Sequence, residues 1–325
     1  MDNGDVAYCP TTCSLITTWF VFKYQALGCR NISGKRCERY TFSMQNFDPG
    51  ITAYVLVVAG LVGLVMGSFI NCWAWRSTHG ESVLKGRSHC PACGHDLGIR
   101  DLVPVISWLA SGCKCRYCGK QVSARYPATE LVCAVVFVAI VAVYGLSIET
   151  VELLLFACIL LFLSLTDLDE YIIPNGCIVA ALVVRAVYLA VIYFMGTISL
   201  DQIGYFVASG LGMGVALVVV VLIADKLLGR ESMGGGDLKL YAVAGFYFGW
   251  QQGIFLVIMS CIIGIIVALL GMRGNAAAEQ LPEGAAEADE GVMKRAIPFG
   301  PSIAAACIVT MLAGGPFITW YLSLL

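Results

Sequence analysis

The chain has 325 residues, of which 59% are hydrophobic and only 13% are charged, and its mean hydropathy is +0.82. So few charged residues cannot cover a water-soluble surface of this size. A formal net charge of −2 at pH 7 gives no basic surface of the kind that binds nucleic acid. The composition therefore excludes a soluble globular protein and predicts an all-α polytopic membrane protein in contact with lipid.

Apolar runs recur along the chain from residue 51 onward. A spanning helix needs about 20 predominantly apolar residues. We expect about eight transmembrane helices, over residues 51–75, 128–147, 150–166, 177–195, 203–224, 238–250, 252–272 and 299–323.

The basic residues predict how these spans are oriented, because Lys and Arg of short loops are retained in the cytoplasm. Eight of them lie in the loop between the first two spans. The connections near 146–150, 196–202 and 249–253 contain none. We therefore expect the first loop in the cytoplasm and, with an even number of spans, both termini outside.

Residues 1–43 fit this scheme badly, because their five basic residues would have to cross the membrane. One interpretation is an N-terminal extension or a misassigned start, with the protein beginning at Met44. The other is a small external tail with disulfides among Cys9, Cys13, Cys29 and Cys37. We divide the chain into this extension (1–43), a first span with its cytoplasmic loop (44–127), and a transmembrane core (128–325) that includes an acidic cytoplasmic linker (274–291).

The cytoplasmic loop carries two similar cysteine pairs. Cys90-x-x-Cys93 and Cys115-x-x-Cys118 each offer two thiolates from a tight turn. Because the cytosol disfavours disulfides, we expect one structural zinc ion held by all four cysteines. A redox pair or a metal-free loop is the alternative, and Cys113 is an alternative ligand to Cys115. Four protein ligands would leave the zinc no open position for catalysis.

Two carboxylates at the cytoplasmic ends of predicted spans form a second candidate site. Asp167 ends the third span in TDLDEYIIPN, and Asp237 begins the sixth in GGGDLKL. Each has an ordinary explanation, because Asp237 can be a helix N-cap and Asp167 can simply end a span. Ionisable groups at the edge of hydrocarbon are costly, however, so two of them at one depth favour a functional site.

Two aspartates held together share one proton, because they cannot both ionise. The charged one can activate water while the neutral one protonates a carbonyl or a leaving nitrogen, which is aspartic protease chemistry. Gly234, Gly235 and Gly236 lack Cβ atoms and would let the backbone of a peptide or a neighbouring helix approach. From helix dipoles alone, we expect the charge on Asp237, at a helix start, and the proton on Asp167, at a helix end.

Other polar residues of the spans give weaker signals. We expect Glu130, near the start of the second span, to line the site or the loop interface. Arg185, inside the fourth span, is expected to pair with a carboxylate or to extend to the lipid interface. The run Gly210-x-Gly212-x-Gly214 lies inside the fifth span, where glycines more often allow close helix packing than bind a cofactor.

Several stretches together resemble the bacterial type IV prepilin leader peptidases, which are also N-methyltransferases. These stretches are GSFINCWAWR from Gly67, the double-cysteine loop, ARYPATELV from Ala124, TDLDEYIIPN and GGGDLKL. The resemblance implies that Asp167 and Asp237 are the catalytic pair. In the family an Asp precedes the Pro by seven residues, and Asp167 with Pro174 fits this spacing whereas Asp169 does not.

The resemblance also implies the reaction. The family removes the basic leader of type IV prepilins and pseudopilins after Gly on the cytoplasmic side of the bacterial inner membrane. It then methylates the new N-terminal residue from S-adenosylmethionine, an activity associated with the cysteine loop. Two alternatives are open: another GxGD intramembrane protease, and a non-enzymatic zinc-bearing scaffold or transporter.

Overall fold

The computed structural model describes residues 48–82, 86–229, 232–278 and 298–324. Over these residues it contains helices and two isolated β-bridges but no strand, and seven helices are long and apolar enough to cross a membrane. This confirms the predicted all-α polytopic membrane class. The predicted extension 1–43 lies outside the described residues, as does the predicted linker after its first five residues, which are helical.

The described helices follow the predicted spans. The first half of the chain contains α2 (Pro49–Thr78), the loop helices η2 (Ile99–Asp101) and α3 (Ile106–Ala110), α4 (Arg125–Tyr144), α5 (Ile148–Glu170) and α6 (Asn175–Phe194). The second half contains α7 (Leu200–Leu228), α8 (Gly235–Ala278), α10 (Gly300–Val309), the π-helical η3 (Thr310–Gly314) and α11 (Gly315–Leu322). The last three elements form one span, as predicted over 299–323.

Helix α8 consists of two arms joined at a sharp bend. Gly249 at the bend has a φ of 73° and a ψ of 179°, a conformation that glycine adopts at low cost. Tyr241 before the bend hydrogen-bonds Ser260 after it. In a straight helix these residues would be about 28 Å apart, so the chain turns back at Gly249. The predicted spans 238–250 and 252–272 are these two arms, which is why seven long helices stand where we expected eight spans.

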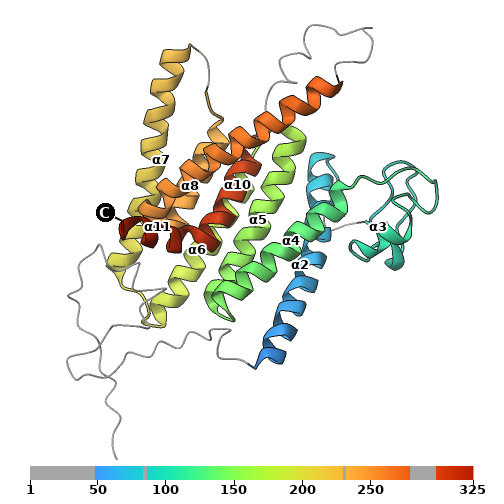
Figure 1. The fold of residues 1–325 in the computed structure, drawn as a ribbon, viewed down its shortest axis with the longest axis horizontal. Coiled ribbons are helices and arrows are strands. Elements are labelled where there is room, and N and C mark those ends of the chain that lie inside the picture. The colour runs from blue at the N-terminus through green and yellow to red at the C-terminus, as the bar shows by residue number, and fades with distance from the viewer. Residues whose placement is uncertain (1–47, 83–85, 230–231, 279–297, 325) are drawn as a thin grey trace, which may run out of the picture.

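The core of the bundle lies where α5, α8 and α10 meet. Figure 1 shows α5 near the middle, with α2 and α4 on one side and α6 and α7 on the other, while the second arm of α8 crosses from one side to the other. Phe156 of α5, Tyr241 of α8 and Ile303 of α10 are almost fully buried there. A Cβ on Gly210 of α7 would lie 2.2 Å from the ring of Phe246. The predicted packing role of Gly210 is therefore confirmed.

A buried ion pair ties three helices together near the bend in α8. Arg185 of α6 lies 2.9 Å from Oε1 of Glu152 in α5. It also donates to the carbonyl oxygens of Phe246 and Tyr247, at 3.0 and 3.1 Å. These carbonyls lie just before Gly249, at the end of the first arm. Of its two expected roles, Arg185 therefore takes the pairing with a carboxylate.

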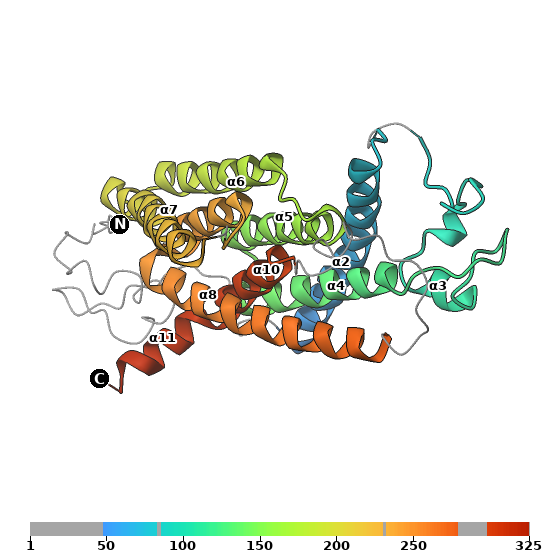
Figure 2. The same cartoon turned by 90° about the horizontal axis from the view of Figure 1, so that it is seen from above.

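The described part of the segment between α2 and α4, residues 79–82 and 86–124, stands apart from the bundle. Figure 1 shows this cysteine loop, with α3 in it, projecting beyond α2 and α4 and away from the other helices, and Figure 2 shows the same separation from above. The candidate chemistry thus lies in two places, the cysteine loop and the helix ends that carry the aspartates.

Candidate active site and metal centre

Asp167 lies in the last turn of α5 and is only 5% exposed. Its Oδ2 accepts a hydrogen bond of 2.8 Å from the backbone N–H of Gly300. Because Gly300 is the first residue of α10, the carboxylate faces the positive end of that helix. A Cβ at Gly300 would lie 2.7 Å from the same oxygen, so only glycine permits this contact. No local motif of the sequence points to Gly300.

Asp237 lies in the first turn of α8, and its backbone N–H donates to Gly234 at 3.2 Å. Among the residues that the structure describes, none donates a hydrogen bond to its carboxylate. A helix N-cap would accept backbone N–H groups, so that explanation does not hold. The charge of Asp167 acts on Asp237. The two carboxylates, 70 residues apart in the chain, therefore lie near each other.

The three glycines before Asp237 are not equivalent. A Cβ on Gly236 would lie 3.0 Å from Cβ of Ile173, in the turn between α5 and α6. A Cβ on Gly234 would approach Asp237 at 3.5 Å, and one on Gly235 would meet no atom within 4 Å. Gly236 therefore lets the start of α8 lie against the turn that follows Asp167. The approach of a substrate along Gly234–Gly236 stays a prediction.

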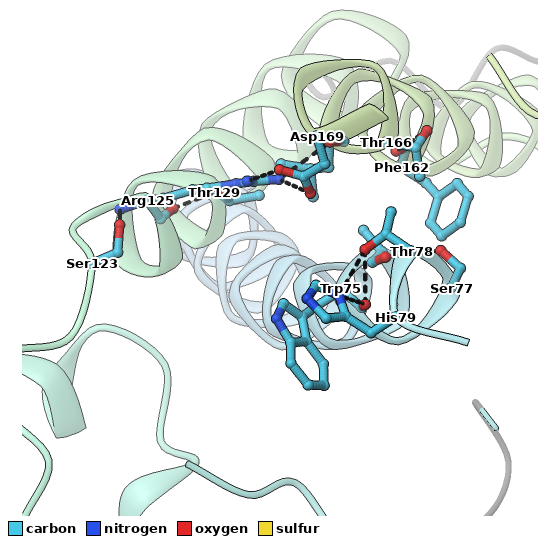
Figure 3. A network of polar contacts seen from close by, with 12 residues as sticks. Trp75, Ser77, Thr78, His79, Ser123, Arg125, Thr129, Phe162, Thr166 and Asp169 are labelled. Atoms are coloured by element: carbon cyan, nitrogen blue, oxygen red, sulfur yellow. Dashed lines mark hydrogen bonds and ion pairs between the residues drawn. The ribbon is translucent and has the colours of Figure 1, made fainter. Parts of the chain in front are cut away.

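Two polar contacts hold helix ends around the carboxylates. Lys239 of α8 donates to Oδ1 of Asn175, the first residue of α6, at 2.8 Å. Arg125, the first residue of α4, forms an ion pair with Asp169, and the Nη2–Oδ2 distance is 2.8 Å. Figure 3 shows this pair bridging α4 and α5. Of the two aspartates at the end of α5, Asp169 is therefore engaged with Arg125, whereas Asp167 is not.

The four predicted cysteines meet in the loop. The Sγ atoms of Cys90, Cys93, Cys115 and Cys118 all lie within 4.8 Å of one another. Thiolates about 2.3 Å from one tetrahedral ion are about 3.8 Å apart, so this donor set fits a zinc ion. Cys113, the alternative ligand, does not belong to the group.

Each cysteine pair lies in the same kind of turn. The N–H of Gly94 donates to the carbonyl of Cys90 at 2.8 Å, and that of Gly119 donates to Cys115 at 2.9 Å. Both glycines have a positive φ, 68° and 71°, which explains why CxxCG occurs twice. A hydrogen bond from the backbone of Cys118 is the main cause that lowers the pKa of the Cys115 thiol to about 7. At Cys115 the turn thus favours the thiolate, which is the form that binds metal.

Two family models match the chain from the middle of α2 to the second arm of α8, with a gap at residues 145–153. The bacterial peptidase A24 N-terminal domain matches residues 61–144, which include the cysteine loop. The type IV leader peptidase family matches residues 154–269, which include both aspartates.

Curated relatives are similar over most of the chain, and each is a prepilin leader peptidase/N-methyltransferase. The protein of Bacillus subtilis is 29% identical over 83% of this chain and 99% of its own length. That of Pseudomonas putida is 29% identical over 81% of this chain and 92% of its own length. That of Pseudomonas aeruginosa is 28% identical over 83% of this chain and 94% of its own length. No solved structure matches the chain.

Proposed function

We propose that Asp167 and Asp237 form the catalytic pair of this chain, because it belongs to the type IV leader peptidase family. We also propose that it acts on the N-terminal segments of type IV prepilins or pseudopilins. The protein is a multi-pass protein of the bacterial inner membrane and a prepilin peptidase. It removes the leader after Gly at the cytoplasmic face and methylates the new N-terminal residue. The matches do not favour another GxGD protease or a non-enzymatic scaffold.

One observation carries the peptidase proposal: the end of α5 and the start of α8 bring two carboxylates together. Asp167 is buried and held by the N–H of Gly300. Asp237 is near enough for the charge of Asp167 to act on it and accepts no hydrogen bond from the described residues. Placing a buried and a half-buried carboxylate next to each other at the edge of a membrane is costly, which favours a functional role for the pair.

The hydrogen bond from Gly300 assigns the two roles. It stabilises negative charge on Asp167, so the shared proton resides on Asp237. Asp167 takes a proton from water as the water oxygen attacks the scissile carbonyl, and Asp237 gives its proton to the carbonyl oxygen. When the intermediate collapses, Asp167 passes its proton to the leaving nitrogen and Asp237 recovers its own. Each cycle therefore consumes one water molecule and restores the pair.

The depth of the pair suits a substrate that is half in water and half in lipid. Both aspartates lie at helix ends which the basic residues place on the cytoplasmic side. A basic leader would remain in water while the apolar helix that follows it stays among the spans. The scissile bond would then lie at the level of Asp167 and Asp237.

The cysteine loop holds the second part of the proposed function. Cys90, Cys93, Cys115 and Cys118 would bind a structural zinc ion, whose coordination positions they fill, so the metal would fold the loop rather than take part in catalysis. S-adenosylmethionine, when bound, supplies the methyl group that the new N-terminal amine accepts.

Cleavage of a prepilin-like peptide by the detergent-solubilised protein tests the proposal. We expect Asp167→Asn and Asp237→Asn to slow cleavage steeply, and Asp169→Asn, which removes only the partner of Arg125, to retain it. Mass spectrometry of the product should show cleavage after Gly and, with S-adenosylmethionine present, a gain of one methyl group. Wild-type rates in either of the first two variants would overturn the assignment.

A further inference from the structure

The segment from Ile99 to Leu109, in the middle of the cysteine loop, exposes a row of large apolar side chains. These are Ile99, Val103, Ile106 and Leu109, which are 85%, 39%, 66% and 63% exposed. Their spacing of four, three and three residues is that of one helical face, and η2 and α3 give the segment helical turns. None of the four belongs to an apolar cluster of the described bundle. We call these four residues the apolar edge of the loop.

The other side of the segment faces the inside of the loop. A cavity of about 480 Å³ lies between the loop, α2 and α4, and its lining includes Leu102, Ser107 and Trp108 but no residue of the apolar edge. Nε1 of Trp108 donates to the carbonyl of Val122 at 3.0 Å. The segment therefore has an inner side that is held against the rest of the loop and an outer side that is the apolar edge.

A strained turn at Val105 fixes the segment to α4. Val105 has a φ of 59° and a ψ of −49°, and the N–H of Ile106 donates to the carbonyl of Pro104 across it. This is the rare, strained form of the γ-turn. The N–H of Val105 donates to Oε2 of Glu130, a buried residue of α4, at 2.7 Å.

Such a conformation persists only where the surrounding contacts impose it. Glu130 therefore holds the turn and, with it, the direction in which α3 leaves α4. Of its two expected positions, Glu130 takes the one at the loop interface.

The apolar edge lies beside the membrane. Both ends of the loop continue into spanning helices, α2 and α4. Figure 1 shows α3 beside these two helices and below the upper ends of α2 and α5, which are the ends that we expect at the cytoplasmic face. The segment is thus at the level where the spans leave the hydrocarbon, and not beyond it.

Exposed basic side chains accompany the apolar edge. Residues 86–124 contain five basic residues and two acidic ones. One of the acidic residues, Asp101, is paired with Arg116 at 3.4 Å. Arg100, Lys114 and Lys120 are exposed and take part in none of the described ion pairs. The cytoplasmic leaflet carries anionic headgroups, which attract basic residues near its surface.

We propose that the apolar edge inserts into the cytoplasmic leaflet, so that the cysteine loop rests on the lipid surface. The four apolar side chains would enter the boundary between headgroups and acyl chains, and the exposed basic residues would contact anionic headgroups. Short amphipathic segments with basic neighbours lie in the interface in this way. The level of α3 beside the spans favours lipid over a soluble protein, which would have to approach through the headgroups.

Labelling by a phospholipid with a photoreactive group in its acyl chain tests the contact in the full-length protein. The protein is placed in nanodiscs of phosphatidylethanolamine and phosphatidylglycerol, and labelled peptides are identified by mass spectrometry. We expect label on residues 99–109 and none on residues 91–96, an exposed turn of the same loop that has no apolar row. In nanodiscs of phosphatidylcholine alone, which carry no net charge, residues 99–109 should be labelled more weakly.

The variant Ile106→Ser/Leu109→Ser should reduce the label on residues 99–109 about tenfold, because two apolar side chains are removed. Ala110→Ser is the matched control, since Ala110 is exposed on the same helix but lies outside the apolar edge, and it should be labelled like wild type. Resistance of the loop to limited proteolysis, equal to that of wild type, shows that each variant is folded. If the double variant fails this check, Ile99→Ser, at the most exposed position of the edge, takes its place.

Three results would contradict the proposal. Absence of label from residues 99–109 of the wild type would assign the surface to a soluble partner instead of lipid. Protein cross-links between the apolar edges of two chains, in place of lipid label, would assign it to a second copy. Label that stays at the wild-type level in a folded variant would show that the apolar edge does not make the contact.

Discussion

The carboxylate of Asp167 depends on Gly300, a residue 133 positions further along the chain. From the order of helices alone, Asp167 ends one helix and Asp237 begins another. Because the start of a helix favours negative charge, this order predicts the negative charge on Asp237. The fold adds a third helix terminus, because α10 begins at Gly300 and directs its first N–H to Asp167. This contact moves the proposed charge to Asp167.

Gly300→Ala tests the importance of that contact. The added Cβ would lie 2.7 Å from Oδ2 of Asp167, so the carboxylate must move. We expect the cleavage rate to fall about 10- to 100-fold, the cost of a displacement of roughly 1 Å in a catalytic group. Initial rates with a prepilin-like peptide measure the effect.

Gly176→Ala is the matched control, because a Cβ at Gly176 would meet no atom within 4 Å. Its cleavage rate should equal that of wild type. If Gly300→Ala were equally active, the N–H of Gly300 would have no part in positioning Asp167.

The sequence predicts the site residues that belong to local motifs, and it misses those whose role depends on contacts between distant segments. The cysteines repeat a local turn whose ligands lie three residues apart, and Asp237 follows a local glycine run. Gly300 has no local signature, because its role arises only when α10 packs against the end of α5. The pairing of Asp169 with Arg125 is likewise a contact between distant segments.

At the scale of elements, apolar runs predict where the spans are but not how they turn. The spans 238–250 and 252–272 were expected from composition, yet their antiparallel packing rests on the positive φ of Gly249. Arg185 supports this bend by binding the carbonyls that precede it. Its partner Glu152 lies one helix earlier, so the sequence could not identify it among the available carboxylates.

Removing one member of this ion pair should destabilise the bundle. Glu152→Gln or Arg185→Met leaves its partner charge buried and uncompensated, which costs about 3–5 kcal/mol. Unfolding of the detergent-solubilised protein by denaturant measures the change. The double variant Arg185→Met/Glu152→Leu should recover much of the loss, because it leaves no unpaired charge.

Glu170→Gln provides the comparison for these variants, since Glu170 ends the same helix but is exposed. It should change the free energy of unfolding little. Additive losses in the double variant would show that Arg185 and Glu152 do not act on stability as a pair.

At the scale of the whole molecule, the chain combines a metal-binding loop with a helical bundle that carries the aspartates. The four cysteines lie in the loop, outside the spans, whereas Asp167 and Asp237 lie at helix ends of the bundle. The sequence predicts this division, because thiol spacing and span length are both local properties. It does not predict the cavity between the two parts, which forms only when the loop folds against α2 and α4.

Metal content tests the loop directly. We expect the purified protein to contain one zinc ion per chain and Cys90→Ser to lose most of it, because a tetrahedral site with three thiolates binds more weakly. Cys113→Ser is the control, since Cys113 lies outside the cysteine group, and it should keep its zinc. Elemental analysis measures both, and equal loss in the two variants would contradict the assigned ligand set.

The central claim is that Asp167 and Asp237 act as one unit, and the kinetics of the double variant test it most directly. Single-turnover cleavage of a prepilin-like peptide should be slowed by Asp167→Asn and by Asp237→Asn to similar extents. The double variant should be no slower than either, because removing one partner already disables the pair. Losses that multiply in the double variant, or a single variant that cleaves at the wild-type rate, would contradict the account.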